Sequence, residues 1–308
     1  PYVAKGQNTV SGNLQSVPSM TPAHSGITLN AIPGPGSYSF ESDSTTGDFS
    51  INIPQGLYEM IIKTKDHRRY VDTLNVISNL YLDTLQMIKP RKTISTYFTD
   101  DLDLLNCLKD QYGSKGVAKL YKWHDEDQPI RIFHENMPTD TASFRSRYNA
   151  AVSSIFSRSH ETAKLREANT DSSVGVKFQY KPRSQIPFNQ SGWTTVDTWN
   201  PDITPKKMTV LIANDQPYPA IGTYLRELCR VLMLFNHSPD VNHVMNITGT
   251  TVSELSVDEG NSIELLYKLK LNTDTRKYKD TVDTIITGIQ DQTYQLPDNF
   301  KLEQNFPN

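Results

Sequence analysis

The hydrophobic pattern of this chain changes character part-way along its length, near Trp123. Before it, through about position 88, short apolar runs alternate with turn residues and no helical period appears, a pattern typical of β-strands. After it, alternating strands are interleaved with long amphipathic helices. A single core rarely grows beyond about 250 residues, and this chain has 308. The sequence therefore predicts a multidomain protein, with an all-β sandwich followed by an α/β or α+β domain.

The predicted N-terminal sandwich covers residues 1–88, and its strands are separated by recognisable turns. The strands are expected at 26–32, 37–40, 49–53 and 58–63. Thr46-Gly47-Asp48 and Pro54-Gln55-Gly56 supply the residues that tight connections need.

Three stretches of this segment resemble the carboxypeptidase regulatory-like domain, an immunoglobulin-like or transthyretin-like sandwich. They are Val10-Ser11-Gly12, Gly26-Ile27-Thr28-Leu29 and the run from Asp43 to Tyr58, of the form D...TGDFSINIPQGLYEMII. Domains of this family usually act as stabilising or adhesive modules beside a second domain. The resemblance therefore implies no chemistry for this part of the chain.

Composition excludes several classes of protein. The 31 Lys and Arg against 34 Asp and Glu leave a formal net charge of -3, so nucleic acid is not expected as a partner. No run approaches about 18 consecutive apolar residues, so no transmembrane segment is expected. The chain begins at Pro1 without a charged and apolar leader, which fits an exported chain after signal removal or a trimmed one. Cys107 and Cys229 are expected to be buried small hydrophobes, or else to form one bridge.

Residues 89–122 read as a helical connector. Leu102, Leu105, Leu108 and Tyr112 are spaced for one helix face, and the run 113–116 contains the breakers that end a helix. In the following domain, 123–270, strands are expected at 129–133, 174–178 and 208–212, and amphipathic helices at 144–156 and 224–235. The first of these helices is expected to bury Phe144, Tyr148, Ala151, Val152, Ile155 and Phe156.

The second helix carries the residues from which a function can be argued. They are Arg226, Glu227 and Arg230, followed by Met233, His237 and Met245. This spacing resembles the metzincin zinc-protease signature, H-E-x-x-H-x-x-G-x-x-H followed by a Met-turn. In that register the catalytic Glu is kept as Glu227, the third His as His237 and the Met-turn methionine as Met245. The first two His positions hold Arg226 and Arg230, and the Gly position holds Met233.

The resemblance extends over about 123–267 and is closest to matrixin-type catalytic domains. Residues 129–132 resemble the first strand, 148–156 the first long helix and 173–178 a later strand. Residues 192–194 fall where the edge strand belongs and 208–213 where its neighbouring strand belongs. Beyond Met245, residues 255–259 and 263–267 resemble the closing helix. The resemblance implies a metzincin-like domain with a degenerate active site.

The substitutions remove two of three zinc ligands. Two His at i and i+4 grip zinc from one helix face, whereas arginine is permanently charged and has no lone pair to offer a cation. We therefore expect no zinc and no catalytic residue, with Glu227 vestigial. Two uses remain open: Glu227 forms a buried ion pair with Arg226 or Arg230, or the two arginines form an anion pocket for a carboxylate or a chain terminus.

A rebuilt metal site from Glu227, His237 and His243 is a further alternative. The histidines outside the signature show no ligand spacing of their own. They are His24, His67, His124, His134, His160 and His243.

The end of the chain, within the predicted linker segment 271–308, suggests where the protein goes. Residues 296–308, LPDNFKLEQNFPN, resemble the opening of the type IX secretion sorting domain of Bacteroidetes-like bacteria. The resemblance implies export across the outer membrane, followed by release or attachment at the cell surface.

Together these features predict a non-catalytic secreted or cell-surface protein that acts as a structural, self-assembling or binding subunit. Its expected partner is a protein, and another copy of itself is one candidate. The stretch Pro1 to Ser25, which has few apolar anchors, could be a strand donated to another chain. The alternatives are a zinc metallopeptidase with a rearranged metal site and Glu227 as general base, and a pseudoprotease that binds peptides beside the strand 208–214.

Overall fold

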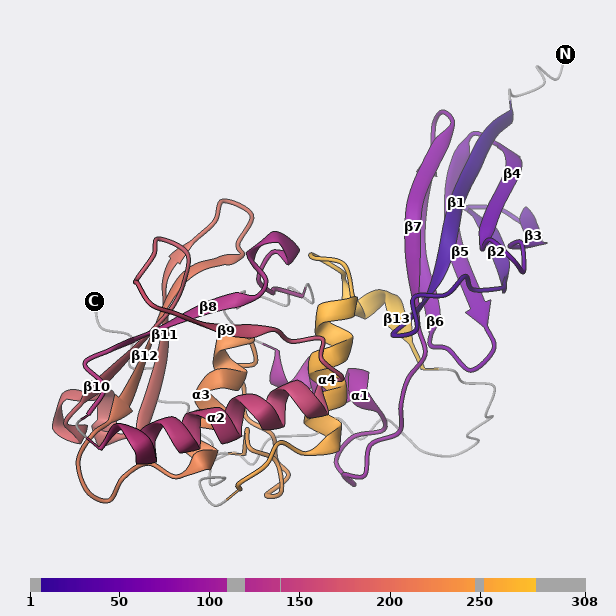
Figure 1. The fold of residues 1–308 in the computed structure, drawn as a ribbon. Helices are drawn as coiled ribbons and strands as arrows, with labels where there is room; N and C mark the ends of the chain where they lie inside the picture. The colour runs from indigo at the N-terminus through magenta and orange to yellow at the C-terminus, as the bar shows by residue number, and fades with distance from the viewer. Residues whose placement is uncertain (1–6, 110–119, 139, 247–251, 281–308) are drawn as a thin grey trace, which may run out of the picture.

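A computed structural model describes residues 7–109, 120–138, 140–246 and 252–280. The chain forms an all-β sandwich and an α/β part, joined by a short helix and the last described residues (Figure 1). The coarse prediction of a sandwich followed by α/β structure is confirmed. Within the described ranges, no helix is long and apolar enough to span a membrane.

The sandwich consists of two sheets. A three-stranded sheet has the order β4-β1-β7, and a five-stranded sheet has the order β13-β6-β5-β2-β3. The strands are β1 (Gln7–Val17), β2 (Ser25–Ile32), β3 (Ser37–Glu41), β4 (Asp48–Pro54), β5 (Gly56–Thr64), β6 (Arg69–Val76), β7 (Leu80–Ile88) and β13 (Tyr278–Lys279). The four strands expected in this region are all present, and β1, β6 and β7 are additional.

Strand β1 overturns the idea of a donated N-terminal segment for the stretch it covers. It lies between β4, which runs antiparallel to it, and β7, which runs parallel. Val10, Leu14 and Val17 are fully buried in the sandwich core. The alternation was hidden in the sequence because small residues occupy the other inward positions. A Cβ on Gly12, for example, would lie 2.8 Å from the Phe49 ring.

The predicted turn at 46–48 rests on a glycine in the left-handed region. Gly47 has φ of +78°, and a Cβ there would lie 2.2 Å from the carbonyl oxygen of Leu14. The Asp43 carboxylate accepts hydrogen bonds from the backbone N–H groups of Thr45 and Thr46, which lower its pKa. Local hydrogen bonding of this kind is why aspartate is favoured at turns.

The α/β part is built on a sheet of order β11-β12-β10-β8-β9, in which only β11 runs antiparallel to its neighbour. The strands are β8 (Ile130–Glu135), β9 (Leu165–Ala168), β10 (Gly175–Lys181), β11 (Gly192–Trp199) and β12 (Pro205–Ala213). The segment expected to be an edge strand is β11, and it lies at the sheet edge. Strand β9, at the other edge, was not predicted.

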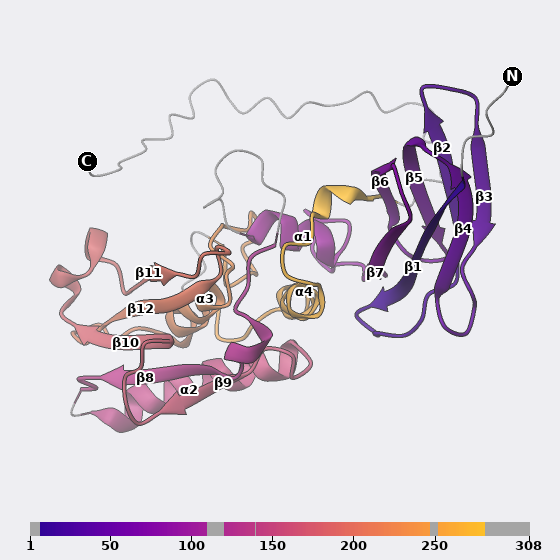
Figure 2. The ribbon, with the colours of Figure 1, turned by 90° about the horizontal axis from the view of Figure 1, so that it is seen from above.

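Helices α2 (Thr141–Arg158) and α3 (Ile221–Val231) contact each other beside this sheet (Figure 2). The buried residues of α2 are Phe144, Tyr148, Ala151 and Ile155, spaced as expected. Phe156 departs from the prediction because it lies off this face and is 42% exposed. Helix α3 is buried on nearly every side, since it packs between α2 and strand β11.

Two further helices connect the parts. Helix α1 (Asp101–Leu108) packs against α4 (Val257–Lys268), whose first turn is closed by a capping box between Ser256 and Glu259. Helix α1 confirms the helix expected in the connector as far as Leu108, whereas Tyr112 and the breakers at 113–116 lie outside the described residues. Short 3₁₀ helices cover Asp125–Asp127, Arg183–Gln185, Pro187–Asn189 and Thr275–Lys277.

The sandwich is attached to the α/β part through buried charges. The Arg68 guanidinium, 6% exposed, forms 2.7 Å ion pairs with Asp100 and Asp103 at the start of α1. Near the end of the described chain, β13 pairs with β6 and so joins the sandwich sheet. The sorting-like segment 296–308 lies outside the described residues.

Candidate functional site

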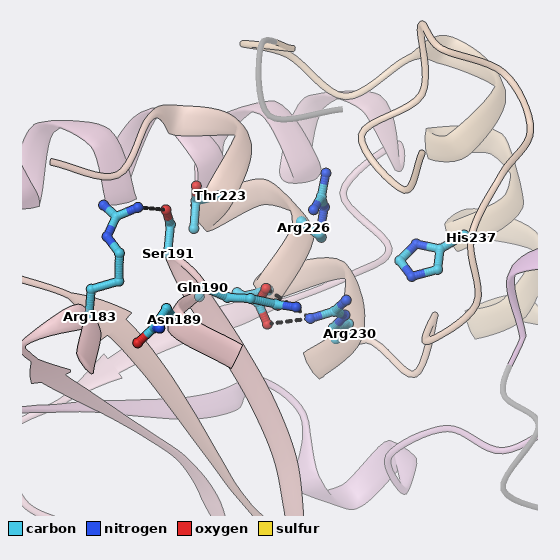
Figure 3. Close-up of a pocket in the computed structure, with 10 residues that line it drawn as sticks. Arg183, Asn189, Gln190, Ser191, Thr223, Arg226, Arg230 and His237 are labelled. Atoms are coloured by element: carbon cyan, nitrogen blue, oxygen red, sulfur yellow. Dashed lines mark hydrogen bonds and ion pairs between the residues drawn. The ribbon is translucent and has the colours of Figure 1, made fainter. Parts of the chain in front are cut away.

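A cavity of about 380 Å³ opens beside α3 and the first residues of β11. It is lined by Arg183, Asn189, Gln190, Ser191, Gly192, Thr223, Arg226, Glu227, Arg230 and His237. Four of these were singled out from the sequence: Arg226, Glu227, Arg230 and His237. In Figure 3, His237 faces the two arginines of α3 across the cavity, and Arg183 lies on the opposite side.

The path of the backbone explains how these four residues converge. Arg226 and Arg230 stand one helical turn apart on α3, so both reach the same side. The helix then ends in a Schellman motif, with hydrogen bonds from Met233 N to Arg230 O and from Leu234 N to Cys229 O. Met233 has φ of +73°, a left-handed conformation that usually belongs to glycine. The sharp turn is thus kept at the signature's Gly position, and it brings His237 back toward the helix.

Glu227 is held in a closed network. Its side chain is 2% exposed, and its carboxylate accepts hydrogen bonds from Thr194 Oγ1 at 2.6 Å and Arg230 Nη1 at 3.0 and 3.1 Å. Gly192 allows this approach, because a Cβ there would lie 2.8 Å from Glu227 Cγ. The buried ion pair left open by the sequence is present with Arg230. Both carboxylate oxygens are therefore occupied by donors.

Arg226 has different partners. Its Nε donates to the carbonyl oxygen of Val244 at 3.3 Å, and its Nη2 donates to that of Asn246 at 2.9 Å. Burial, followed by the charge of Arg230, lowers the pKa of Arg226. The guanidinium thereby fixes the chain on both sides of Met245.

The Met-turn residue lies next to His237. Met245 is fully buried, and its carbonyl oxygen accepts from Ser238 N and lies 3.2 Å from His237 Nδ1. Its backbone N–H donates to Glu259 Oε1 at 3.0 Å. Partial burial, then the charges of Arg230 and Arg226, keep the pKa of His237 below 6.5. These effects favour the neutral form of the imidazole.

His243 takes no part in the cavity. Its Nδ1 lies 2.7 Å from Ser238 Oγ, and its ring stacks against Phe98. A metal site rebuilt from Glu227, His237 and His243 is therefore not formed, because His243 is held elsewhere. No group of three or more His, Cys, Asp or Glu suited to a metal occurs in the part of the chain that the structure describes.

The two cysteines are free, so the bridge considered from the sequence is wrong. Cys229 is fully buried in α3, as expected of a small hydrophobe. Cys107 is only partly buried, and its Sγ donates to the carbonyl oxygen of His237 at 3.5 Å.

The sequence did not indicate the far wall of the cavity. There Arg183 donates from Nη1 to Ser191 Oγ at 3.0 Å and from Nη2 to the Pro217 carbonyl oxygen at 2.7 Å. Thr194, which donates to Glu227, was also missed as a site residue. Arg183 belongs to no motif, and Thr194 was noted only as part of the expected edge strand. Each reaches the site through contacts between segments distant in the sequence.

The strand beside which a peptide cleft was expected lies inside the sheet. Strand β12, which contains 208–213, is paired on one side with β11 and on the other with β10. Its backbone therefore has no free edge with which a peptide strand could pair. The edge strand next to the cavity is β11.

Comparisons with known proteins leave the family open. No family model matches the chain, and no curated protein matches it. Two matching structures are a C-terminal and an N-terminal interface mutant of a type II cohesin–X-dockerin complex from Acetivibrio cellulolyticus. Both are 18% identical over 33% of this chain and 75% of theirs, with TM-scores of 0.22 and 0.21. TM-scores this low do not assign the chain to their fold.

Proposed function

We propose that this protein is a non-catalytic binding subunit built on an inactivated metzincin fold. One observation carries the proposal: Arg226, Arg230 and His237, the three positions that the signature assigns to zinc ligands, line one cavity with Glu227. Arginine stands at two of these positions.

Further features support the metzincin ancestry. The chain turns at Met233 in a conformation suited to glycine, the residue that the signature has there. Met245 is buried behind His237, and the strand expected at the sheet edge is β11.

The chemistry of the cavity argues against hydrolysis. A zinc protease needs a metal-bound water and a carboxylate free to act as general base. Two guanidinium groups repel a cation, and the Glu227 carboxylate accepts from Thr194 and Arg230. Both requirements are lost together, while the cavity stays open.

Binding is favoured over self-assembly as the function of this chain. Strand β1 is part of its own sandwich, so this strand is not available for donation to a neighbouring copy. The cavity volume falls in the range of about 300–1,000 Å³ that ligand sites usually have. An extracellular or cell-surface location is part of the proposal and rests on the resemblance of 296–308 to a sorting domain.

The test combines three measurements on the natively purified full chain: metal content by mass spectrometry, peptide cleavage with and without a chelator, and size-exclusion light scattering. We expect less than about one-tenth zinc per chain, no cleavage and a monomer. About one zinc per chain with chelator-sensitive cleavage would establish the rearranged metallopeptidase instead. A metal-free polymer would contradict the binding role and favour a structural subunit.

A further inference from the structure

The cavity carries an excess of positive charge. Arg226 and Arg230 contribute two positive charges, and Glu227 contributes one negative charge. Arg183 lies 4.0 Å from Asp215 through its Nε, and Asp215 also accepts from its backbone N–H. Burial and the neighbouring arginines favour the neutral form of His237, so the charge balance is set by the arginines and their carboxylates. The cavity therefore has one positive charge without a counterion.

The guanidinium groups of α3 also have unused donors. Arg226 donates through Nε and Nη2 to backbone carbonyls, and Arg230 donates through Nη1 to Glu227. Arg226 Nη1 and Arg230 Nε and Nη2 form no hydrogen bond with any residue that the structure describes. Charged donors of this kind form strong, bidentate pairs with carboxylates and phosphates.

An aromatic pair adjoins cavity-lining residues in the sequence, since Phe188 precedes Asn189 and Trp193 follows Gly192. Phe188 is 74% exposed and lies with its ring 5.7 Å from that of Trp193, the second residue of β11. Phe188 and Asn189 both have φ above +50°, so this connection holds the Phe188 ring outward at a local cost. Asn189 itself lines the cavity.

We propose that the cavity binds the C-terminal carboxylate of a polypeptide, with the last side chains of that ligand against Phe188 and Trp193. The proposal rests on the non-catalytic role above and names the ligand class of the same site. A single uncompensated positive charge matches a monoanion such as a carboxylate better than a phosphate dianion. Exposed Phe188, packed beside half-buried Trp193, favours a chain end that carries side chains over a free small acid.

The probe is a pool of random hexapeptides, labelled at the N-terminus and synthesised both as free acids and as C-terminal amides. Binding to the full chain is measured by fluorescence polarisation at low salt. We expect the free acids to bind at least about tenfold more tightly than the amides, because a charged hydrogen-bonded pair is lost in the amides. Equal binding of acids and amides would overturn the proposal.

Arg226→Gln is the main variant, since it removes a cation without breaking the Glu227–Arg230 pair. It should weaken free-acid binding at least about tenfold and leave amide binding unchanged. Arg166→Gln is the matched control, because Arg166 is exposed on β9 and does not line this cavity. Arg166→Gln should bind as the natural chain does, and equal losses in both variants would overturn the assignment to this cavity.

Competition experiments distinguish a polypeptide chain end from a free small anion as the ligand. Acetate should displace the peptides only at much higher concentration than an unlabelled free-acid peptide does. Acetate or inorganic phosphate that competes as well as the peptide would overturn the chain-end assignment. A failure of all peptides to bind would overturn this inference alone, because the zinc and cleavage measurements test the non-catalytic role separately.

Discussion

The sandwich and the α/β part of this molecule differ in the kinds of side chain that they bury. The sandwich core is apolar and alternates along its strands, as in β1 with Val10, Leu14 and Val17. The α/β part buries ionisable side chains, among them Glu227 at 2% and Glu259 at 0% exposure. Burying a charge is costly unless it is paired, so such residues need a specific reason. A sandwich follows from pattern alone, whereas these buried carboxylates of the α/β part have specific partners. Glu227 pairs with Arg230 and accepts from Thr194, and Glu259 accepts from Met245 N and Ser256.

Removing Arg230 should have the largest effect on the unfolding free energy. This variant also distinguishes the buried charges of the α/β part most clearly from the apolar core of the sandwich. Arg230→Ala leaves the buried Glu227 carboxylate without its ion-pair partner, which costs about 3–5 kcal/mol of unfolding free energy. Urea denaturation measures the loss. The double variant Glu227→Gln/Arg230→Gln should lose much less, since no buried charge is left unpaired. If Arg230→Ala left the unfolding free energy unchanged, the Glu227–Arg230 pair would not stabilise the fold.

In the sandwich, the corresponding test creates a cavity in the core instead of leaving a buried charge unpaired. Leu14→Ala removes a fully buried side chain from β1 and should cost about 2–5 kcal/mol. Tyr81→Ala on the neighbouring strand β7, where Tyr81 is 68% exposed, should stay within about 0.5 kcal/mol. If both variants unfolded at the same denaturant concentration as the natural chain, β1 would not belong to this core.

Acidification should lower the unfolding free energy because of His134, which lies in the α/β part. Burial lowers the pKa of His134 to about 4 from an ordinary 6.5, and its ring packs edge-on against Tyr148. The unfolded chain binds this proton first as pH falls, so stability should decline between about pH 6.5 and pH 4, by up to about 3 kcal/mol.

The measurement is the unfolding free energy as a function of pH, for the natural chain and for His134→Gln. The variant should be less stable at pH 7 but should lose less stability on acidification. Parallel profiles of the two proteins would show that His134 is not the group responsible.

The smallest effect is expected at a helix cap. Ser256 accepts from Glu259 N and closes the capping box of α4, so Ser256→Ala should cost about 1 kcal/mol. Ser153→Ala, on the exposed face of α2, should be neutral or slightly stabilising because alanine favours helix. Thermal unfolding of the two variants compares them directly.

Most of the secondary structure could be predicted from the sequence because the patterns that mark strands, helices and turns are local. Strands β2 to β5 and helices α2 and α3 follow from apolar spacing and from turns such as the one at Gly47. Strand β1 escaped because Gly12 and Ser16 occupy inward positions, where apolar residues would have marked a strand. Strand β13 joins the sandwich from the far end of the chain, and two residues are too few to carry a pattern.

At the site, the motif on α3 indicated Arg226, Glu227, Arg230 and His237, which line one cavity. It could not indicate which arginine would pair with Glu227, because the choice depends on the loop around Met245. Arg226 donates to the carbonyls of Val244 and Asn246 and is held away from the carboxylate. Arg183 and Thr194 come from other segments, so their roles needed the tertiary structure.

The most direct test of the proposed inactivated metal centre is to place histidines at the two positions that the zinc-protease signature assigns to them. The double variant Arg226→His/Arg230→His places histidines at i and i+4 of α3, opposite His237. Zinc content and calorimetric titration are measured for this variant, for Arg226→Ala/Arg230→Ala, which supplies no ligands, and for the natural chain. We predict about one zinc per chain, bound tightly, for the histidine variant alone. A histidine variant that folds but binds no more zinc than the alanine variant would contradict the proposed metzincin origin of this cavity.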